Sequence, residues 1–282
     1  MISLSNIKLF ISDLDGTLLD DGKNISDKLL ESIKELMSSG VYFSINTGRE
    51  YAMLEHYLRL LNPNCPIVSN NGAEVVKYPS NEVIQRIQMP MEETRKMISF
   101  LLDNRIDFCA TTISKAYFPK WSKMTEFYRD YNKLAKENNL TGFPVILIDE
   151  YDQIEEPRIN KMILRTDLSD SKRAIEFAKQ LDAFSFTMSS ELILEIMPKG
   201  MDKYIGLKKI CEYLDITLEE VCVAGDYDND LRCLSASGMS VAPENATDKI
   251  KSVSKLIVDS NNQSGLFKII NLIIESRKNE VK

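Results

Sequence analysis

Two aspartates separated by one residue follow a short apolar run near the amino terminus. Asp13 and Asp15 come directly after Lys8–Ser12, and Gly16 follows them. Two carboxylates at this spacing point the same way from an extended backbone, and a glycine lets the chain turn tightly while its amides approach an anion. The pattern favours a functional role for Asp13. The alternative is a hairpin turn, because Asp-Gly between hydrophobic runs is a strong hairpin signal.

Two further polar segments come directly after predicted strands. Asn46–Arg49 offers a hydroxyl, a flexible amide and a helix N-terminus to a phosphate, although Thr-Gly after a strand is also ordinary turn chemistry. Gly225–Asp230 gathers three carboxylates and an amide on a strand-to-helix turn, which suits a hard cation with oxygen ligands. A plain aspartate-rich helix N-cap is the alternative for this segment.

The acidic segment does not match a calcium-binding EF-hand loop. Such a loop would need glycine where this chain has Leu231 and glutamate where it has Ser237. A strand also precedes the segment, so the EF-hand is excluded.

Lys203, at the start of a predicted helix, would by itself be an ordinary surface charge.

Strands and helices alternate at both ends of the chain, whereas the middle has its own mixture of short strands and helices. The end segments predict an α/β class core, a doubly wound parallel sheet formed by residues 1–83 and 197–282. The middle predicts an inserted α+β cap domain, residues 84–196. Periodicity predicts helices over Ser26–Ser39, Glu50–Leu61, Asp202–Leu214, Asp228–Ala236 and Leu266–Glu275, with Val83–Gln88 as the first strand of the middle region.

The carboxyl ends of parallel strands meet along one edge of a sheet, where open α/β sheets place their ligands. Asp13, Thr47 and the acidic segment that contains Asp226 each follow a different predicted core strand. We therefore expect these three groups to lie along the same edge.

In this order and spacing the segments resemble the haloacid dehalogenase superfamily, and within it the Cof-like phosphatases with a type IIB cap. The resemblance covers nearly the whole chain. Asp13 and Asp15 match the first motif, Thr47 the second, Lys203 the third, and Gly225–Asp230 the fourth. Asn71-Gly72-Ala73 is similar to a family feature, whereas Tyr227 and Pro243 depart from the usual pattern and affect expectations about substrate more than about catalysis.

The resemblance implies a magnesium-dependent phosphatase with an aspartyl-phosphate intermediate. Asp13 would be the nucleophile and Asp15 the general acid and base. A carboxylate oxygen of Asp13, the backbone carbonyl of Asp15 and Asp226 would hold Mg²⁺, with Asp230 in the outer shell or holding Lys203. The phosphoryl group would be cradled by Thr47, Lys203, Asn229 and the amides of Leu14 and Gly48.

The substrate implied is a small phosphorylated metabolite, with a sugar phosphate favoured and the cap selecting the leaving group. The aromatic segments Ala116–Trp121 and Glu126–Tyr128 could form the floor of a substrate pocket or pack within the core of the cap. Arg49 could face the site or the solvent. We treat His56 as structural or exposed. A phosphomannomutase-like phosphotransferase and a phosphosugar-binding protein without turnover are the alternative functions.

Composition limits the other classes of function. The 282 residues carry a net charge of −7 with scattered basic residues, so no nucleic-acid partner is expected. No apolar run approaches the ~18 residues that span a bilayer, so we expect no membrane partner and a cytoplasmic location. For the assembly we expect a monomer or weak homodimer. The five cysteines form no CxxC pair, which indicates reduced core thiols.

Overall fold

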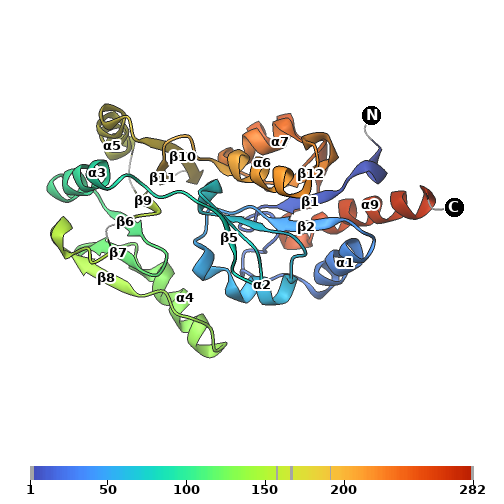
Figure 1. Ribbon diagram of the computed structural model, residues 1–282, viewed down its shortest axis with the longest axis horizontal. Coiled ribbons are helices and arrows are strands. Elements are labelled where there is room, and N and C mark those ends of the chain that lie inside the picture. Colours follow the sequence, from blue (N-terminus) through green and yellow to red (C-terminus); the bar gives the residue numbers. More distant parts are fainter. Residues whose placement is uncertain (1–2, 157, 166–167, 191, 281–282) are drawn as a thin grey trace. The chain divides into compact units, whose positions relative to one another are not determined.

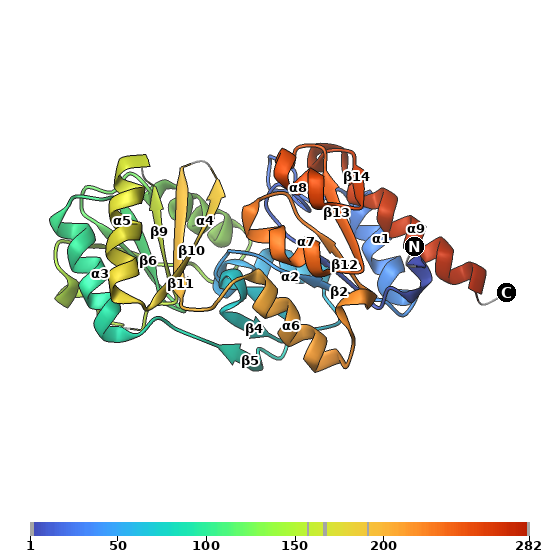
Figure 2. The ribbon, with the colours of Figure 1, turned by 90° about the horizontal axis from the view of Figure 1, so that it is seen from above.

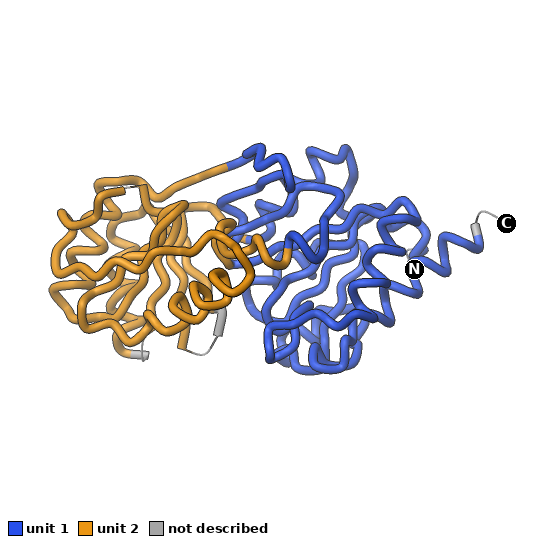
Figure 3. The backbone as a smooth tube through the Cα atoms, turned by 90° about the horizontal axis from the view of Figure 1, so that it is seen from below, with its two compact units in different colours: residues 1–48, 58–85, 203–282 blue, residues 49–57, 86–202 orange. Residues whose placement is uncertain are grey.

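The computed structural model describes residues 3–156, 158–165, 168–190 and 192–280. The chain forms two compact units (Figure 3), and unit 2 comprises residues 49–57 and 86–202. Unit 1 comprises the remaining residues, 1–48, 58–85 and 203–282. The short segment 49–57, expected in the core, clusters with unit 2 because Met53 packs among buried side chains of that unit such as Phe118.

Unit 1 is built on a five-stranded parallel sheet (Figures 1 and 2) in the order β14-β13-β12-β1-β2. In the register of β1, Ser12 lies opposite both Ala224 of β12 and Ile45 of β2. In the chain, β2 follows β1 and pairs with one edge of it. The later strands β12, β13 and β14 lie beyond the other edge of β1. A ligand crevice is expected where the strand order reverses. The strands are β1 (Leu9–Ser12), β2 (Tyr42–Ile45), β12 (Val221–Ala224), β13 (Met239–Pro243) and β14 (Leu256–Val258).

Helices cover both faces of this sheet, as the nearly continuous apolar strands require. Leu9 and Ile11 pack in one cluster with residues of α6 (Lys203–Leu214), α7 (Leu231–Ala236) and α8 (Asp248–Val253). On the opposite face lie α1 (Asp27–Ser38) and α9 (Leu266–Glu280), as Figure 1 shows. The predicted doubly wound parallel sheet is therefore confirmed.

A small antiparallel sheet, β3-β4-β5, continues unit 1 beyond β2. Its strands are β3 (Ile67–Ser69), β4 (Glu74–Val76) and β5 (Val83–Arg86). The strand that was predicted to open the middle region thus pairs within this sheet. The helix predicted over Glu50–Leu61 is wrong as a single element. It divides into a 3₁₀ turn, η2 (Tyr51–Met53), and α2 (Glu55–Leu61), with Leu54 between them. The boundary between the two units falls within α2, after Tyr57.

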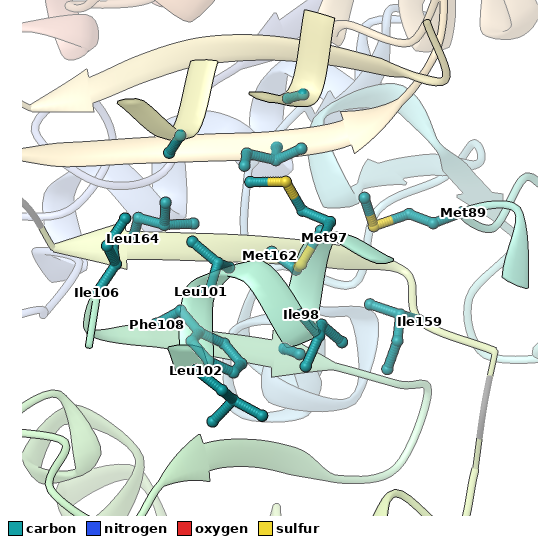
Figure 4. Close-up of a cluster of buried hydrophobic side chains, with 14 of the residues drawn as sticks. Met89, Met97, Ile98, Leu101, Leu102, Ile106, Phe108, Ile159, Met162 and Leu164 are labelled. Atoms are coloured by element: carbon teal, nitrogen blue, oxygen red, sulfur yellow. The ribbon is translucent and has the colours of Figure 1, made fainter. Parts of the chain in front are cut away.

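Unit 2 is a six-stranded sheet in the order β10-β11-β9-β6-β7-β8, with α3 (Met91–Asp103) and α5 (Leu168–Leu181) packed on one face. Figure 4 shows the core on that face, where Met97, Leu101, Phe108 and Met162 are buried. The other face packs against α4 (Thr125–Glu137). All the pairs are antiparallel except β7–β8. The strands are β6 (Phe108–Thr111), β7 (Ala116–Pro119), β8 (Val145–Ile148), β9 (Lys161–Arg165), β10 (Phe184–Ser190) and β11 (Ile193–Pro198).

The aromatic segments of unit 2 divide into packing residues and exposed ones. Tyr117, Phe118 and Tyr128 are buried, so their role is packing. Phe127 is half exposed, and the guanidinium of Arg49 lies 5.9 Å from its ring centroid.

Within the described ranges, no helix combines the length and the apolar character that crossing a bilayer demands.

Candidate active site

Backbone hydrogen bonds bring three of the predicted segments to one edge of the parallel sheet. The amide of Asp13 donates to the carbonyl of Ala224, and the amide of Asn46 donates to that of Ser12, both at 2.9 Å. The amide of Gly225 continues the ladder to Val241 at 3.2 Å. The residues that follow β1, β2 and β12 therefore meet at the carboxyl edge of the sheet, as the sequence predicted.

Lys203 joins two of the carboxylates at this edge, those of Asp13 and Asp230. Its Nζ lies 2.8 Å from Oδ1 of Asp13 and 2.7 Å from Oδ1 of Asp230. The lysine is fully buried as the first residue of α6, although its sequence position alone suggests a surface charge. The other oxygen of Asp230 accepts from the amides of Asp226 and Tyr227, so the same carboxylate orders the acidic loop.

Asp226 approaches the aspartate motif because two glycines leave room for carboxylates. Gly16 has a φ of +76°, and a Cβ at this position would clash with Oδ2 of Asp226. A Cβ at Gly225 would likewise clash with the side chain of Asp230. The hydroxyl of Thr17 donates to Oδ1 of Asp226 at 2.8 Å and fixes its orientation.

Burial and crowding of like charges change the protonation of this cluster. Burial, together with the charges of Asp230 and Asp226, raises the pKa of Asp13 well above its usual value, and Lys203 opposes this effect. Burial and Asp230 raise the pKa of Asp226 to about 6. Burial alone would lower the pKa of Lys203, but the adjacent carboxylates of Asp13 and Asp230 raise it, so the lysine is positively charged.

The cluster suits a divalent metal ion. Carboxylate oxygens of Asp13, Asp226 and Asp230 lie within 4.8 Å of one another. Oxygen ligands of this kind are the ones that Mg²⁺ prefers. One buried lysine cannot balance three carboxylates, and a divalent cation would supply the missing positive charge. The donor set therefore fits the predicted magnesium.

Asp15 is not a member of that carboxylate group. Its Oδ1 instead accepts a hydrogen bond from Nζ of Lys23 at 2.7 Å. Both side chains are partly exposed. The two carboxylates of the first motif thus have different surroundings, one buried beside Lys203 and one at the surface beside Lys23.

The predicted phosphate-binding residues lie around the same edge. Thr47 is buried, its amide donates to the carbonyl of Val68, and its carbonyl accepts from the amide of Asn71. The side-chain amide of Asn229 donates to Oδ1 of Asn71 at 3.3 Å. Leu14 is buried in the turn that follows Asp13, where its carbonyl accepts the amides of residues 17–19. Gly48 closes the unit 1 segment that contains Thr47.

Three residues of this region received no role from the sequence. Thr17 orients Asp226, Asn71 contacts Asn229, and Lys23 contacts Asp15. The sequence did carry a signal for Asn71, because an Asn-Asn-Gly run favours backbone with positive φ. In the structure Asn70, Asn71 and Gly72 all have positive φ. Lys23 lacks such a signal, since its contact depends on how the chain folds back.

A buried lysine and three carboxylates at the switch point of a parallel sheet suit the binding of a divalent cation together with an anionic ligand. The family model for haloacid dehalogenase-like hydrolases matches residues 10–270. The chain therefore belongs to the haloacid dehalogenase-like hydrolases, and the predicted Cof-like branch is confirmed.

Individual proteins agree with this assignment. The chain is 28% identical over 274 residues to the 5-amino-6-(5-phospho-D-ribitylamino)uracil phosphatase YitU of Bacillus subtilis, covering 93% of this chain and 96% of that protein. A haloacid dehalogenase-like hydrolase from Bacteroides thetaiotaomicron has the same fold, with a TM-score of 0.80, 23% identity, and coverage of 95% and 99%. A subclass IIB sugar phosphatase also shares it, with a TM-score of 0.79, 19% identity, and coverage of 94% and 98%. The protein is a phosphatase acting on small phosphorylated compounds.

Proposed function

We propose that the protein is a Mg²⁺-dependent phosphatase that hydrolyses phosphorylated sugars and related polyols through a phosphoryl group carried on Asp13. The observation that carries this proposal is the 2.8 Å contact between Lys203 and Asp13, at the centre of the acidic cluster. A buried carboxylate beside a buried cation is held in one orientation, which a nucleophile requires.

In the first half-reaction, an oxygen of Asp13 attacks phosphorus and the bond from phosphorus to the leaving oxygen breaks. Asp15 donates its proton to that oxygen, so the leaving group departs as a neutral alcohol. When bound to the carboxylates of Asp13 and Asp226 and the carbonyl of Asp15, Mg²⁺ supplies charge neutralisation for the transferring group. Asp230 holds Lys203 against Asp13.

In the second half-reaction, water attacks phosphorus and the bond to Asp13 breaks. Asp15, now ionised, takes the proton of that water, which returns both carboxyl groups to their starting states. Lys203, Thr47, Asn229 and the amides of Leu14 and Gly48 donate to the phosphoryl oxygens in both steps. Inorganic phosphate is the second product.

The choice of substrate belongs to unit 2 in this proposal, because the core residues bind only the phosphoryl group and the metal. A sugar or sugar-alcohol phosphate is favoured, and the similarity to a phosphatase named for a ribityl phosphate supports this class. Location in the cytoplasm and a monomeric or weakly dimeric state stay predictions from the sequence.

The decisive experiment is to trap the phosphoryl group on Asp13. Purified protein with Mg²⁺ and a sugar phosphate would be quenched in acid within the first turnover, and its peptides examined by mass spectrometry. We expect a phosphoryl group on the peptide that contains Asp13, and none in Asp13→Asn protein. Turnover without any protein-bound phosphoryl group would overturn the covalent mechanism.

A phosphate-release screen would then identify the substrate. The panel should contain sugar phosphates, sugar-alcohol phosphates, nucleotides and phosphorylated cofactors, each with Mg²⁺. We expect the highest kcat/KM with a phosphorylated sugar or polyol. Phosphate retained on the sugar would indicate a phosphotransferase, and stoichiometric binding without release would indicate a binding protein.

A further inference from the structure

Lys23 makes an ion pair that stability does not explain. Its Nζ lies 2.7 Å from Oδ1 of Asp15, and the two side chains are 50% and 38% exposed. Exposed ion pairs contribute little to folding, since water screens the charges and ordering two side chains costs entropy. The partner of Lys23 is nevertheless the carboxylate to which the proposed function gives both proton transfers.

The backbone of Lys23 has an unfavourable conformation. Its φ is +63°, in the left-handed region where glycine and asparagine are favoured over lysine. Gly22 and Asn24, the residues best suited to that region, flank it. A non-glycine residue in this region costs free energy, which the surrounding turn must offset.

The turn that carries Lys23 is closed by its own hydrogen bonds. The amide of Lys23 donates to the carbonyl of Asp20 at 2.9 Å, and the amide of Asp20 donates to the carbonyl of Asn24 at 3.0 Å. Oδ1 of Asp20 accepts the amide of Asn24 at 2.8 Å. The position of Lys23 is therefore defined before its side chain makes any contact.

Asparagines from the other end of the chain anchor this turn. Asn262 exchanges two hydrogen bonds of 2.9 Å with Asp21. The side chain of Asn261 donates to the carbonyl of Leu19. Asn245 donates to the carbonyl of Gly16 at 2.7 Å. Both the aspartate motif and the turn are thus fixed to residues 245–262, more than 200 positions away in the sequence.

We propose that Lys23 is a positioning residue that orients the Asp15 carboxylate for proton transfer. The inference rests on the proposed role of Asp15 as general acid and base. The anchored turn holds the ammonium group, and the ammonium group holds Oδ1 of Asp15, which fixes the orientation of the carboxylate. Lys23 acts only through Asp15 and does not bind the phosphoryl group.

The test compares substrates that do and do not need a proton on the leaving group. Single-turnover release of the leaving group would be measured with an alkyl phosphate and with p-nitrophenyl phosphate, for wild type, Lys23→Met and Lys23→Arg. We expect Lys23→Met to slow release from the alkyl phosphate about tenfold, a part of the usual worth of general acid catalysis, and to leave p-nitrophenol release nearly unchanged. Lys23→Arg should restore most of the rate.

The Asp15→Asn background separates positioning from a structural effect. Without a carboxyl proton at residue 15, adding Lys23→Met should produce no further loss. Lys278→Met is the matched control, because Lys278 makes a similar exposed ion pair, 2.8 Å from Glu35, on α9.

Equal losses with both substrates, or a further loss in the Asp15→Asn background, would overturn the positioning role. An unchanged rate in Lys23→Met would do the same. Failure of the wild type to hydrolyse either phosphate would instead contradict the proposed function itself.

Discussion

The ammonium group of Lys203 lies 2.8 Å from the carboxylate of Asp13 in a place that solvent does not reach. This pair joins the third sequence motif to the first across 190 positions of the chain. A buried charge of either sign is costly when its partner is removed. The pair therefore links stability to the proposed chemistry, and the predictions below separate the two.

The first prediction concerns the two carboxylates of the aspartate motif. Asp13→Asn should abolish turnover because an amide cannot accept the phosphoryl group. Asp15→Asn should lower kcat by roughly 10²- to 10⁴-fold for substrates with poor leaving groups, the usual worth of general acid–base catalysis. Steady-state phosphate release measures both. Near-normal turnover of a pure Asp13→Asn preparation would rule out this nucleophile.

The second prediction concerns Lys203 and stability. Lys203→Met should lower the free energy of unfolding by about 3–5 kcal/mol in metal-free protein, because Asp13 and Asp230 then lack their buried cation. The double variant Lys203→Met/Asp13→Asn should recover part of the loss, since it removes one of the carboxylates. Urea unfolding measures both values. Strictly additive losses in the double variant would argue against a coupled pair.

The third prediction concerns the metal. EDTA should silence activity and Mg²⁺ should restore it. Mg²⁺ at about 100 times its dissociation constant should also raise the free energy of unfolding by about 2.7 kcal/mol, because it binds only the folded state. Asp226→Asn should weaken that stabilisation without unfolding the protein. Full activity after exhaustive EDTA dialysis would contradict a metal requirement.

The fourth prediction concerns the cysteines. Burial raises the pKa of Cys65 to about 12 and that of Cys211 to about 11. Unfolded thiols titrate near pH 8.5, so above that pH the unfolded state loses protons that the folded state retains, and stability falls as pH rises. At about pH 8 a thiol reagent should modify native protein slowly and urea-unfolded protein rapidly. Fast labelling of Cys65 in native protein would show that it is not buried.

The fifth prediction concerns the buried charges of unit 2. Nζ of Lys161 lies 3.0 Å from Glu195 and 3.8 Å from Glu50, and all three side chains are buried. Lys161→Met should destabilise unit 2 by about 3–5 kcal/mol through the unpaired carboxylates. Cys109, buried in unit 2, should then react with a thiol reagent, while Cys222 in unit 1 stays protected. Equal labelling of both cysteines would show that the two units unfold together.

Much of the fold and of the candidate site follows from local patterns. Each of Asp13, Thr47 and Asp226 comes after an apolar strand, and parallel strands must bring such residues to one edge. The start of the helix predicted over Ser26–Ser39 also depends on a local contact, since the hydroxyl of Ser26 accepts the amide of Leu29. The catalytic roles of these residues remain proposals for the experiments above.

Other features could not be predicted because they depend on contacts between distant residues. Helical periodicity does not record the break at Leu54, which follows a 3₁₀ turn whose Met53 packs against distant residues of unit 2 such as Phe118. The burial of Lys203 depends on carboxylates that lie elsewhere in the sequence. The contact of Lys23 with Asp15 needs a turn anchored by Asn261 and Asn262, so no local signal could reveal it.

The strand order has a consequence for synthesis on the ribosome. β1 is translated early but lies between β2 and β12, so one of its edges has no partner until Val221–Ala224 has emerged. Residues 86–202, which form most of unit 2, are released before that point. The nascent chain therefore carries β1 with one unpaired edge through most of translation, and the sheet of unit 1 can be completed only after most of unit 2 has emerged.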